Sequence, residues 1–510
     1  LLSYLQQLGH GDVGPSLDGE LRELVLKAVR ADFELAERCG ITAQQRIKAP
    51  LTVLGGMDDA SVPAAALEGW RDRTASSFNR RHFRGGHFFT ETERGDVLRF
   101  LTETLDEDIR QQPPSIAFGP REDFPQETCL HDHFRRQAAL TPHHTAVVDG
   151  SVSLTFAELD HQSDRLAARL LAQGCGLDRL VAIVMEPSAD FVVALLATLK
   201  AGGGYLPIPI GMPDAAIADI LSVSNPIAVA TTASQAGRLP EAWRTLDRCT
   251  ILERGWQDRL SDAELKALSL APRPGGGNLA FCVMSSGTTG QPKGILCPHR
   301  GAVNSYWWRY HHLAYGDDER EACNVFFVWE VLRPMLQGRP AYVIADDIIF
   351  DPPRLIEFLE RHRITRVLFT PSLLDQVLKD SRQDFAERLA NLRVVICNGE
   401  VVTTALADRF NKRLPHVSLV NDYSISECHD VATVELRTSS PQSASRYLPV
   451  GRPMSNVNVY ILDNEQKPVA VGTPGEVYVG GDGLALGYLN NTSETALRFL
   501  DDPFARPCSG

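Results

Sequence analysis

Apolar positions along this chain fall into two patterns, and the change between them divides the chain into two blocks. In the first block, Glu20 to Glu37 carries apolar side chains at helical spacing, and Ala49 to Gly56 is a short apolar run that ends in glycines. Such a run predicts a buried strand followed by a tight turn, and residues near 92–105 predict another helix. Residues 1–106 are therefore predicted to form one folded block.

Residues 107–125 show no periodicity and contain four prolines, which predicts a linker. After the linker, short apolar runs alternate with amphipathic segments over 126–510. The runs at 145–148, 180–184 and 366–369 predict strands, and the segments at 191–200 and 353–363 predict helices. This alternation predicts α/β layers built on largely parallel sheets.

Composition narrows the function classes. A length of 510 residues is too great for one hydrophobic core, so at least two domains are expected. The net charge of −13 argues against nucleic acid as a main partner. No apolar run of membrane-spanning length, no signal pattern and no C-x-x-C pair is present, so we expect a cytoplasmic protein with reduced cysteines. Because the chain opens on Leu1, we expect it to be part of a larger protein.

One segment, from Met284 to Gly294, concentrates residues that suit phosphate binding. It reads MSSGTTGQPKG, with three glycines, four hydroxyl residues and one lysine, and a strand-like run from Asn278 leads into it. Glycines allow a tight turn near a ligand, while hydroxyls, exposed N–H groups and a lysine charge bind phosphate oxygens. The segment has neither the Walker ending nor the G-x-G-x-x-G spacing. It resembles instead the phosphate loop of adenylate-forming enzymes, which include acyl-CoA synthetases, luciferases and the adenylation domains of nonribosomal peptide synthetases.

Four more segments resemble the same family, and they occur in the family's order. They are LTFAEL at 154–159, LKAGGGYLP at 199–207, NDYSISE at 421–427, and the stretch from Gly475 to Tyr488. The resemblance implies the large multi-sheet α/β N-terminal subdomain of an adenylate-forming enzyme over 126–510. It places the small lid subdomain after residue 510.

The resemblance implies that a carboxylate attacks the α-phosphate of ATP, which releases pyrophosphate and leaves an acyl-adenylate. The protein mainly positions two anions and neutralises charge. By resemblance, Tyr423 stacks on adenine, Lys293 contacts phosphate, and Glu427 is the Mg²⁺ ligand, since Mg²⁺ favours a carboxylate with phosphate oxygens. The implied ATP-binding set is Ser285, Ser286, Gly287, Thr288, Thr289, Gly290, Lys293, Asn398, Gly399, Glu400, Asn421, Tyr423 and Ser426.

The start of the acid pocket departs from amino-acid-activating relatives. Those relatives read Phe-Asp-x-Ser-x-x-Glu, and this chain reads NVFFVWE over 324–330, which places Val325 where an aspartate binds the α-ammonium. Valine cannot neutralise that group, so a standard α-amino acid is disfavoured. The implied pocket is Val325, Phe326, Trp329, Ser372, Ile396, Asn398, Asp422, Asp430 and Val431.

Two carboxylates and two aromatic residues in that pocket suggest a cationic substrate. We predict an acid with a basic group away from the α-position: a β- or ω-amino acid, a guanidino acid or a betaine. The alternative left open is that Asp422 or Asp430 faces solvent or pairs with an arginine.

The first block resembles the C-terminal half of a thioesterase with the α/β-hydrolase fold. Asp59 follows the predicted strand in GGMDD, and His87 lies 28 residues later in GGHFF. In that fold the acid orients the histidine, which acts as general base. Asp59 is the predicted acid and Asp58 the alternative. No G-x-S-x-G precedes Asp59, so this sequence contains the predicted acid and histidine of the triad but not its serine.

The sequence therefore predicts a peptide-synthetase adenylation domain behind a thioesterase. Its implied partners are an acid substrate, a carrier domain bearing phosphopantetheine, and in some members a small helper protein; a membrane partner is not expected. A free-standing acid–CoA ligase, the activating domain of a carboxylate reductase, and a degenerate docking scaffold are the alternatives.

Overall fold

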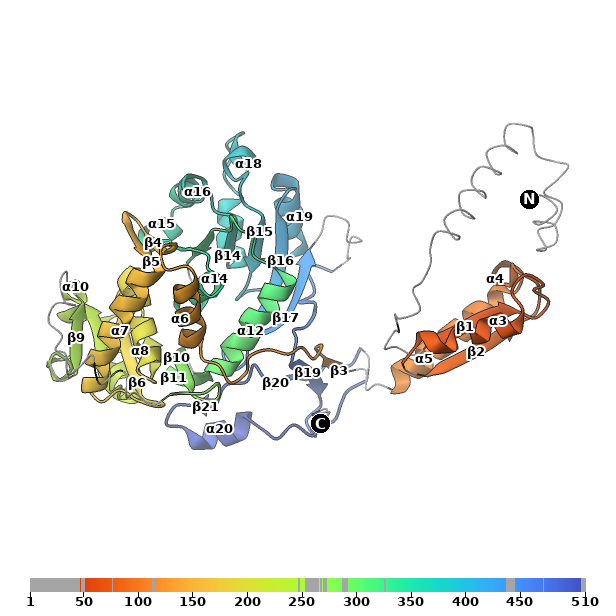
Figure 1. Ribbon diagram of the computed structural model, residues 1–510, viewed down its shortest axis with the longest axis horizontal. Helices are drawn as coiled ribbons and strands as arrows, with labels where there is room; N and C mark the ends of the chain where they lie inside the picture. The colour runs from red at the N-terminus through yellow and green to blue at the C-terminus, as the bar shows by residue number, and fades with distance from the viewer. Residues whose placement is uncertain are drawn as a thin grey trace. The chain divides into compact units, whose positions relative to one another are not determined.

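The structure is a computed structural model that describes residues 46, 51–75, 77–111, 115–245, 248–252, 266, 268, 273–286, 292–324, 327–436, 445–470 and 472–505. It divides into two compact units, Leu1–Pro114 and Ser115–Gly510 (Figure 1). The predicted helix at 20–37 and the phosphate-loop residues 287–291 lie outside the described residues, as do Val325 and Phe326. No described helix combines the length and the apolar character needed to cross a bilayer.

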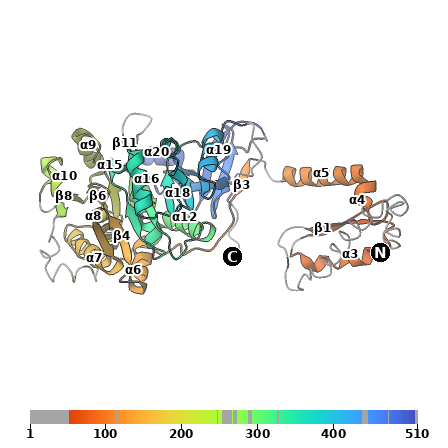
Figure 2. The same cartoon turned by 90° about the horizontal axis from the view of Figure 1, so that it is seen from above.

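The first unit contains a two-stranded parallel sheet, β1 (Leu51–Gly56) and β2 (Phe78–Phe83). The strand predicted over 49–56 is present and a turn follows its glycines, but only Gly55 and Gly56 are buried, so the prediction of a buried strand is met in part. Phe83, Phe89 and Val97 form its small buried core, and Figure 2 shows α3 and α5 on opposite sides of β1. Its helical elements are α3 (Ala64–Glu68), η1 (Arg71–Arg73), α4 (Phe89–Thr92) and α5 (Arg94–Gln111).

The predicted linker at 107–125 contains more regular structure than its prolines indicate. Helix α5 continues to Gln111, and β3 (Ile116–Phe118) pairs with β19 (Val457–Leu462) of the second unit. Short strands of this kind carry little pattern of their own, because the partner strand more than 300 positions away determines the pairing.

The second unit contains two large sheets that are largely parallel, as the α/β alternation predicts, with antiparallel strands at both edges of one sheet and at one edge of the other. The seven-stranded sheet has the order β21 (Gly487–Tyr488), β11 (Pro292–Pro298), β10 (Leu279–Ser286), β7 (Gly204–Pro207), β6 (Leu180–Val184), β8 (Ala228–Thr232) and β9 (Cys249–Leu252). The predicted strand at 180–184 is β6, and it is buried along its whole length.

The nine-stranded sheet supplies most of the polar residues considered below. Its order is β18 (Arg452–Pro453), β17 (His429–Leu436), β16 (Ser418–Ile425), β15 (Val394–Cys397), β14 (Arg366–Phe369), β12 (Glu321–Cys323), β13 (Ala341–Val343), β4 (Thr145–Asp149) and β5 (Val152–Thr155). A three-stranded sheet, β20 (Glu476–Gly481), β19 and β3, completes the unit.

Helices cover these sheets, and several begin at a hydroxyl cap. Thr155, Ser188 and Thr370 each accept a hydrogen bond from a backbone N–H in the first turn of the helix that follows. The helices are α6 (Leu130–Leu140), α7 (Phe156–Ala172), α8 (Ala189–Lys200), α9 (Asp214–Ser224), α10 (Ala233–Ala236), η2 (Glu241–Trp243), α12 (His299–His312), α13 (Phe327–Glu330), α14 (Leu332–Met335), α15 (Asp346–Ile349), α16 (Pro352–Arg361), α17 (Pro371–Val377), α18 (Phe385–Arg388), α19 (Thr404–Arg413) and α20 (Thr492–Arg498).

Helix α12 connects the two large sheets. It packs against β11 of the seven-stranded sheet and β17 of the nine-stranded sheet, and Figure 1 shows it crossing the centre of the unit. A helix in this position can present side chains to the space between the sheets, where ligands of α/β proteins commonly bind.

Candidate functional site

In the first unit, the structure brings together the two predicted hydrolase residues. Asp59 follows β1 and His87 follows β2, and because the strands are parallel, their carboxyl ends meet at one edge. His87 Nδ1 lies 2.9 Å from Asp59 Oδ2. The close approach requires Gly56, since a Cβ atom there would lie 2.3 Å from the Gly86 carbonyl oxygen. The alternative acid, Asp58, uses its backbone N–H to bond the Gly85 carbonyl.

Hydrogen bonds hold Asp59 in its ionised form. Burial by itself raises the pKa of this carboxyl group, but bonds from the Ser61 hydroxyl and His87, and from the Ser61 and Val62 N–H groups, lower the pKa to about 2. The Ser61 hydroxyl also lies 3.0 Å from His87 Nδ1. An ionised acid that fixes one imidazole nitrogen leaves the other available as a base.

In the second unit, a cavity of about 380 Å³ lies between the two large sheets and α12. Its wall combines aromatic rings, hydroxyls and carboxylates from both sheets. The lining residues are Phe281, Val283, Ala302, Ser305, Tyr306, Trp329, Glu330, Leu368, Asn398, Gly399, Ser424, Ile425, Ser426, Glu427, His429 and Asp430.

Part of the predicted nucleotide site lines this cavity. Asn398, Gly399, Ser426 and Glu427 belong to its wall. Glu427 accepts a hydrogen bond of 2.9 Å from the Tyr488 hydroxyl. A carboxylate beside hydroxyls is a donor set that suits Mg²⁺ with phosphate oxygens, so the residues present fit that ion.

Other predicted nucleotide residues lie nearby but outside the wall. Tyr423 packs on the apolar cluster around Val431, and the Asn421 side-chain amide donates to the Pro449 carbonyl at 2.8 Å. Glu400 accepts bonds from the backbone N–H and the hydroxyl of Ser372. The contact with Ser372 holds the segment that follows β15, while Asn421 and Tyr423 belong to β16.

The ends of the phosphate segment form a hairpin. Ser285 and Ser286 end β10 opposite Lys293 and Pro292 of β11, while Gly287, Thr288, Thr289 and Gly290 lie outside the described residues. Lys293 Nζ donates to Glu494 Oε1 of α20 at 2.7 Å. The lysine predicted to contact phosphate is therefore paired with a carboxylate in this structure.

Only some residues of the predicted acid pocket line the cavity. Trp329, Asn398 and Asp430 line the cavity. Ile396 and Val431 are instead buried in apolar clusters, and Ser372 pairs with Glu400. Asp422 lies behind the wall, joined to Asn398 by a 2.8 Å hydrogen bond.

A buried arginine neutralises both predicted carboxylates in part. Arg309 of α12 donates to Asp422 Oδ2 at 2.7 Å and to Asp430 Oδ2 at 2.9 Å, and Ser305 also donates to Asp430. The structure thus supports the alternative in which the two carboxylates pair with an arginine. In the sequence, Arg309 lies in the run YWWRYHH, and its two carboxylate partners lie more than 110 positions further along the chain.

Sharing one guanidinium makes the two carboxylates unequal. Burial, and then the charge of Asp430, raise the pKa of Asp422 to about 7, against the effect of Arg309. For Asp430, burial raises the pKa, but Arg309 and Ser305 outweigh burial and lower it. Asp422 Oδ1 is buried without a hydrogen-bond partner among the described residues.

A second buried ionic group extends along the same wall. Arg333 contacts both Glu321 and Glu330, and Glu330 lines the cavity. Together with the Arg309 group, four carboxylates face two guanidinium groups. Of these four carboxylates, Glu330 and Asp430 line the cavity. Sequence reasoning did not identify this group because Glu321, Arg309 and Arg333 lie outside the quoted motifs.

Comparison with known proteins identifies relatives of the second unit. A family model described as AMP-binding enzyme matches residues 134–489. The glycine betaine reductase ATRR of Emericella nidulans is 37% identical over 377 residues, covering 73% of this chain and 29% of that protein. Tyrocidine synthase 3 of Brevibacillus parabrevis is 34% identical over 382 residues, covering 74% of this chain and 6% of that protein. The chain thus spans less than a third of either relative.

Solved structures agree with this result. A crystal structure of the nonribosomal peptide synthetase FmoA3 has a TM-score of 0.67 and 26% identity, over 76% of this chain and 41% of that one. The N-terminal subdomain of Klebsiella oxytoca NpsA, in complex with 3-hydroxyanthranilyl-AMSN, has a TM-score of 0.63 over 74% of this chain and 92% of that one. At 21% identity, the second likeness shows the fold alone.

Proposed function

Because the chain belongs to the AMP-binding enzyme family and has its adenylate-forming α/β fold, we propose that the second unit activates a carboxylic acid with ATP as an acyl-adenylate. The observation that carries the proposal is one cavity that joins Glu427 and Ser426 to Trp329, Glu330 and Asp430. Such a cavity can hold the triphosphate and the acid side by side, which is the main requirement of this reaction.

In this proposal, the chain's own residues bind and orient. Lys293 exchanges Glu494 for phosphate oxygens, and Glu427 holds Mg²⁺ together with those oxygens. Mg²⁺, when bound, supplies positive charge that offsets the phosphate charge. Tyr423 and the segment from Asn398 to Glu400 form the adenine side, as the family resemblance implies.

We further propose that the acid carries a positive charge. Although Arg309 pairs with Asp422 and Asp430, the described residues that line the cavity include three carboxylates, Glu330, Glu427 and Asp430, and no lysine or arginine. Tyr306, Trp329 and Phe281 add aromatic faces to the same cavity. A quaternary ammonium group suits aromatic faces and needs no hydrogen-bond acceptor, so a betaine is the first candidate among the predicted classes. The resemblance to a protein named as a glycine betaine reductase supports this choice.

The fate of the adenylate follows from the same relatives. We propose transfer to the phosphopantetheine thiol of a carrier domain, since the relatives include synthetases that build peptides and a reductase. A carboxylate-reductase activating domain is the second candidate, favoured by the valine at position 325 and by the reductase relative.

ATP–pyrophosphate exchange with the complete protein tests the proposal. Glycine betaine is compared with 3,3-dimethylbutanoate, which has the same shape without the charge. We expect exchange with the betaine to exceed the neutral acid by about tenfold or more, since a desolvated cation–π contact contributes about 2 kcal/mol. Equal exchange would refute the cationic substrate but not adenylation, whereas no exchange with any acid would favour a scaffold.

Two variants test which residues determine the preference for betaine over the neutral acid. Trp329→Leu is expected to lower the betaine preference while leaving exchange with a neutral acid in place, because Trp329 lines the acid end of the cavity. Glu427→Gln is expected to lower exchange for every acid, because it removes the proposed Mg²⁺ ligand.

We also propose that the first unit supplies the acid and histidine of a thioesterase. The 2.9 Å contact between His87 and Asp59 supports this proposal. In the complete protein, Asp59→Asn is expected to lower thioester hydrolysis by about 10⁴-fold, as loss of the orienting acid does in serine hydrolases. Asp58→Asn is the matched control, and equal losses in the two variants would refute the assignment.

A further inference from the structure

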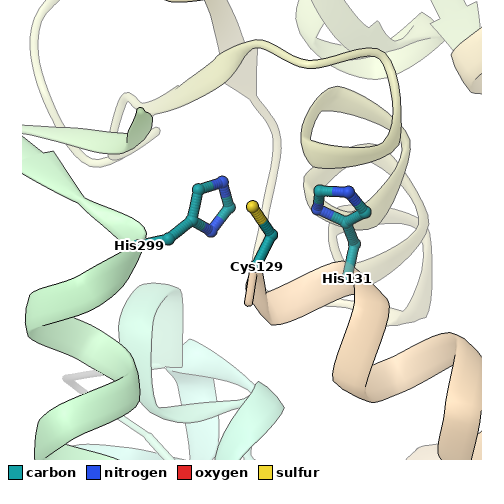
Figure 3. A group of neighbouring side chains, drawn as sticks. All are labelled: Cys129, His131 and His299. Carbon is teal, nitrogen blue, oxygen red and sulfur yellow. The ribbon is translucent and has the colours of Figure 1, made fainter. Parts of the chain in front are cut away.

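Three side chains with metal-binding atoms meet outside the cavity, where α6 and α12 begin. Cys129 directly precedes α6, His131 lies in its first turn, and His299 is the first residue of α12. Their ligand atoms all lie within 4.8 Å of one another. Figure 3 shows the Cys129 sulfur between the two imidazole rings, whose centroids are 5.6 Å apart.

This cluster is buried, yet its polar atoms have few partners. The three residues are 0%, 3% and 1% exposed in the order Cys129, His131 and His299. His131 Nδ1 has no hydrogen-bond partner in the described part of the chain. Buried polar atoms are normally paired, so an orphaned imidazole nitrogen beside a thiol needs a physical explanation.

The other two residues make hydrogen bonds to backbone groups. Cys129 Sγ donates to the Pro274 carbonyl at 3.3 Å, and His299 Nδ1 accepts the Leu130 N–H at 3.3 Å. The first bond ends when the thiol loses its proton to a metal, and the second occupies only one of the two imidazole nitrogens of His299.

We propose that Cys129, His131 and His299 bind Zn²⁺. One thiolate and two neutral imidazoles are ligands that this ion prefers, and the thiol releases one proton to solvent when the sulfur–zinc bond forms. The Asp132 carboxylate lies 3.8 Å from His131 Nε2, on the side away from the orphaned Nδ1. At this distance the carboxylate does not accept a hydrogen bond from the ring, but it places negative charge behind the histidine. The Pro274 carbonyl oxygen, already beside the sulfur, is available as a fourth donor.

Such an ion links two helices rather than taking part in chemistry. None of its three ligands lines the cavity, but α12 carries Ser305, Tyr306 and Arg309 a few residues after His299. Zn²⁺ bound here fixes the start of α12 to the start of α6. The site therefore stabilises the helix that forms one wall of the cavity.

The test uses the full chain, stripped with a chelator, and then titrated with Co²⁺ as a spectroscopic substitute for Zn²⁺. We expect one Co²⁺ per chain, a thiolate-to-cobalt charge-transfer band, loss of that band on addition of Zn²⁺, and a higher Tm with Zn²⁺ than without. Cys129→Ser is expected to abolish the band. His131→Asn is expected to weaken Co²⁺ binding by more than about 100-fold, since even changes behind the ligands cost 10–100-fold.

Two control variants separate metal binding from packing. His133→Asn alters a buried histidine of the same helix that contacts Trp307 and Arg136 instead, and Cys249→Ser alters another buried cysteine. Both are expected to retain the cobalt band. If Cys129→Ser does not fold, the cobalt spectrum of the wild-type chain tests the proposal. A wild-type chain that binds no Co²⁺, or binds it without the sulfur band, overturns the proposal.

Discussion

Each unit places a little-exposed carboxylate beside a basic group, but the two basic groups differ in their exposure to solvent. In the first unit, the side chain of His87 is 38% exposed while it contacts Asp59. In the second unit, the side chains of Arg309 and Asp422 are each 1% exposed. Hydrogen bonds overcome burial at Asp59 and lower its pKa to about 2, whereas burial dominates at Asp422 and raises its pKa to about 7.

This difference shows that a basic neighbour alone does not determine the protonation state of a carboxyl group. The balance between the cost of desolvation and the hydrogen bonds that the group accepts determines it. Asp59 accepts bonds from two N–H groups, a hydroxyl and an imidazole, and its partner His87 remains open to solvent for proton transfer. Asp422 shares one guanidinium with Asp430, and its Oδ1 has no hydrogen-bond partner within the described part of the chain. The first arrangement suits general-base chemistry, and the second suits a charged, rigid wall.

The largest expected effect comes from removing the shared guanidinium. Arg309→Met leaves two buried carboxylates without their cation, which is expected to lower the free energy of unfolding by about 3–5 kcal/mol. Urea unfolding followed by circular dichroism measures the change. Arg354→Met is the control, because Arg354 and Asp347 form an exposed pair whose loss is expected to cost less than about 1 kcal/mol. Equal shifts in the two variants would contradict the contrast.

The second effect is a dependence of stability on pH. Folded Asp422 retains a proton between its ordinary pKa of 3.8 and about 7, so its stabilising contribution is full below 3.8 and is lost as pH rises through 7. The slope is expected to reach about 1.4 kcal/mol per pH unit. Urea unfolding at pH 5, 6, 7 and 8 is compared between wild type and Asp422→Asn. A difference between the two that does not change with pH would refute the raised pKa.

The first unit is expected to show the opposite pH dependence. Since the pKa of Asp59 is lowered from 3.8 to about 2, its contribution is present above 3.8 and is lost as pH falls towards 2. Hydrogen-exchange pulse labelling of peptides covering 51–89, after incubation at pH 2 to 5, is expected to show acid-induced opening in wild type. In Asp59→Asn the opening should depend less on pH, and an unchanged profile would count against the lowered pKa.

The smallest effect concerns the pair at the phosphate segment, which is neither buried nor fully exposed. The side chains of Lys293 and Glu494 are 19% and 23% exposed. Glu494→Gln frees the lysine from a competing carboxylate, so ATP is expected to bind more tightly. The expected change is a few-fold, because ion pairs near the surface contribute little free energy. Titration with a fluorescent ATP analogue measures this change. Glu476→Gln, at an exposed glutamate near Arg498, is the control, and equal tightening in both variants would argue against direct competition.

Regular elements with a strong pattern were predictable from the sequence. The strands predicted at 145–148, 180–184 and 366–369 are present as β4, β6 and β14, and the helices at 191–200 and 353–363 as α8 and α16. Their apolar periodicity is local, so neighbours along the chain are sufficient to specify them. The placement of Asp59 and His87 after strands was predicted from the family resemblance instead, and the strand β2 before His87 was not predicted from its own residues.

The composition of the cavity wall was less predictable. Motif matching identified Trp329, Asn398 and Asp430, but it also included Ile396 and Val431, which the core buries. It missed Tyr306 and His429, since α12 lies between two sheets only after the chain has folded.

The α/β alternation, the family motifs and the valine at position 325 can all be read from the sequence. The pairing of Asp422 and Asp430 with Arg309, and the meeting of Cys129 and His131 with His299, depend on contacts between distant segments of the folded chain. Local pattern follows from the hydrophobic effect acting along a helix or strand. The charge state and partners of a buried group depend instead on which distant side chains replace the water it loses on folding.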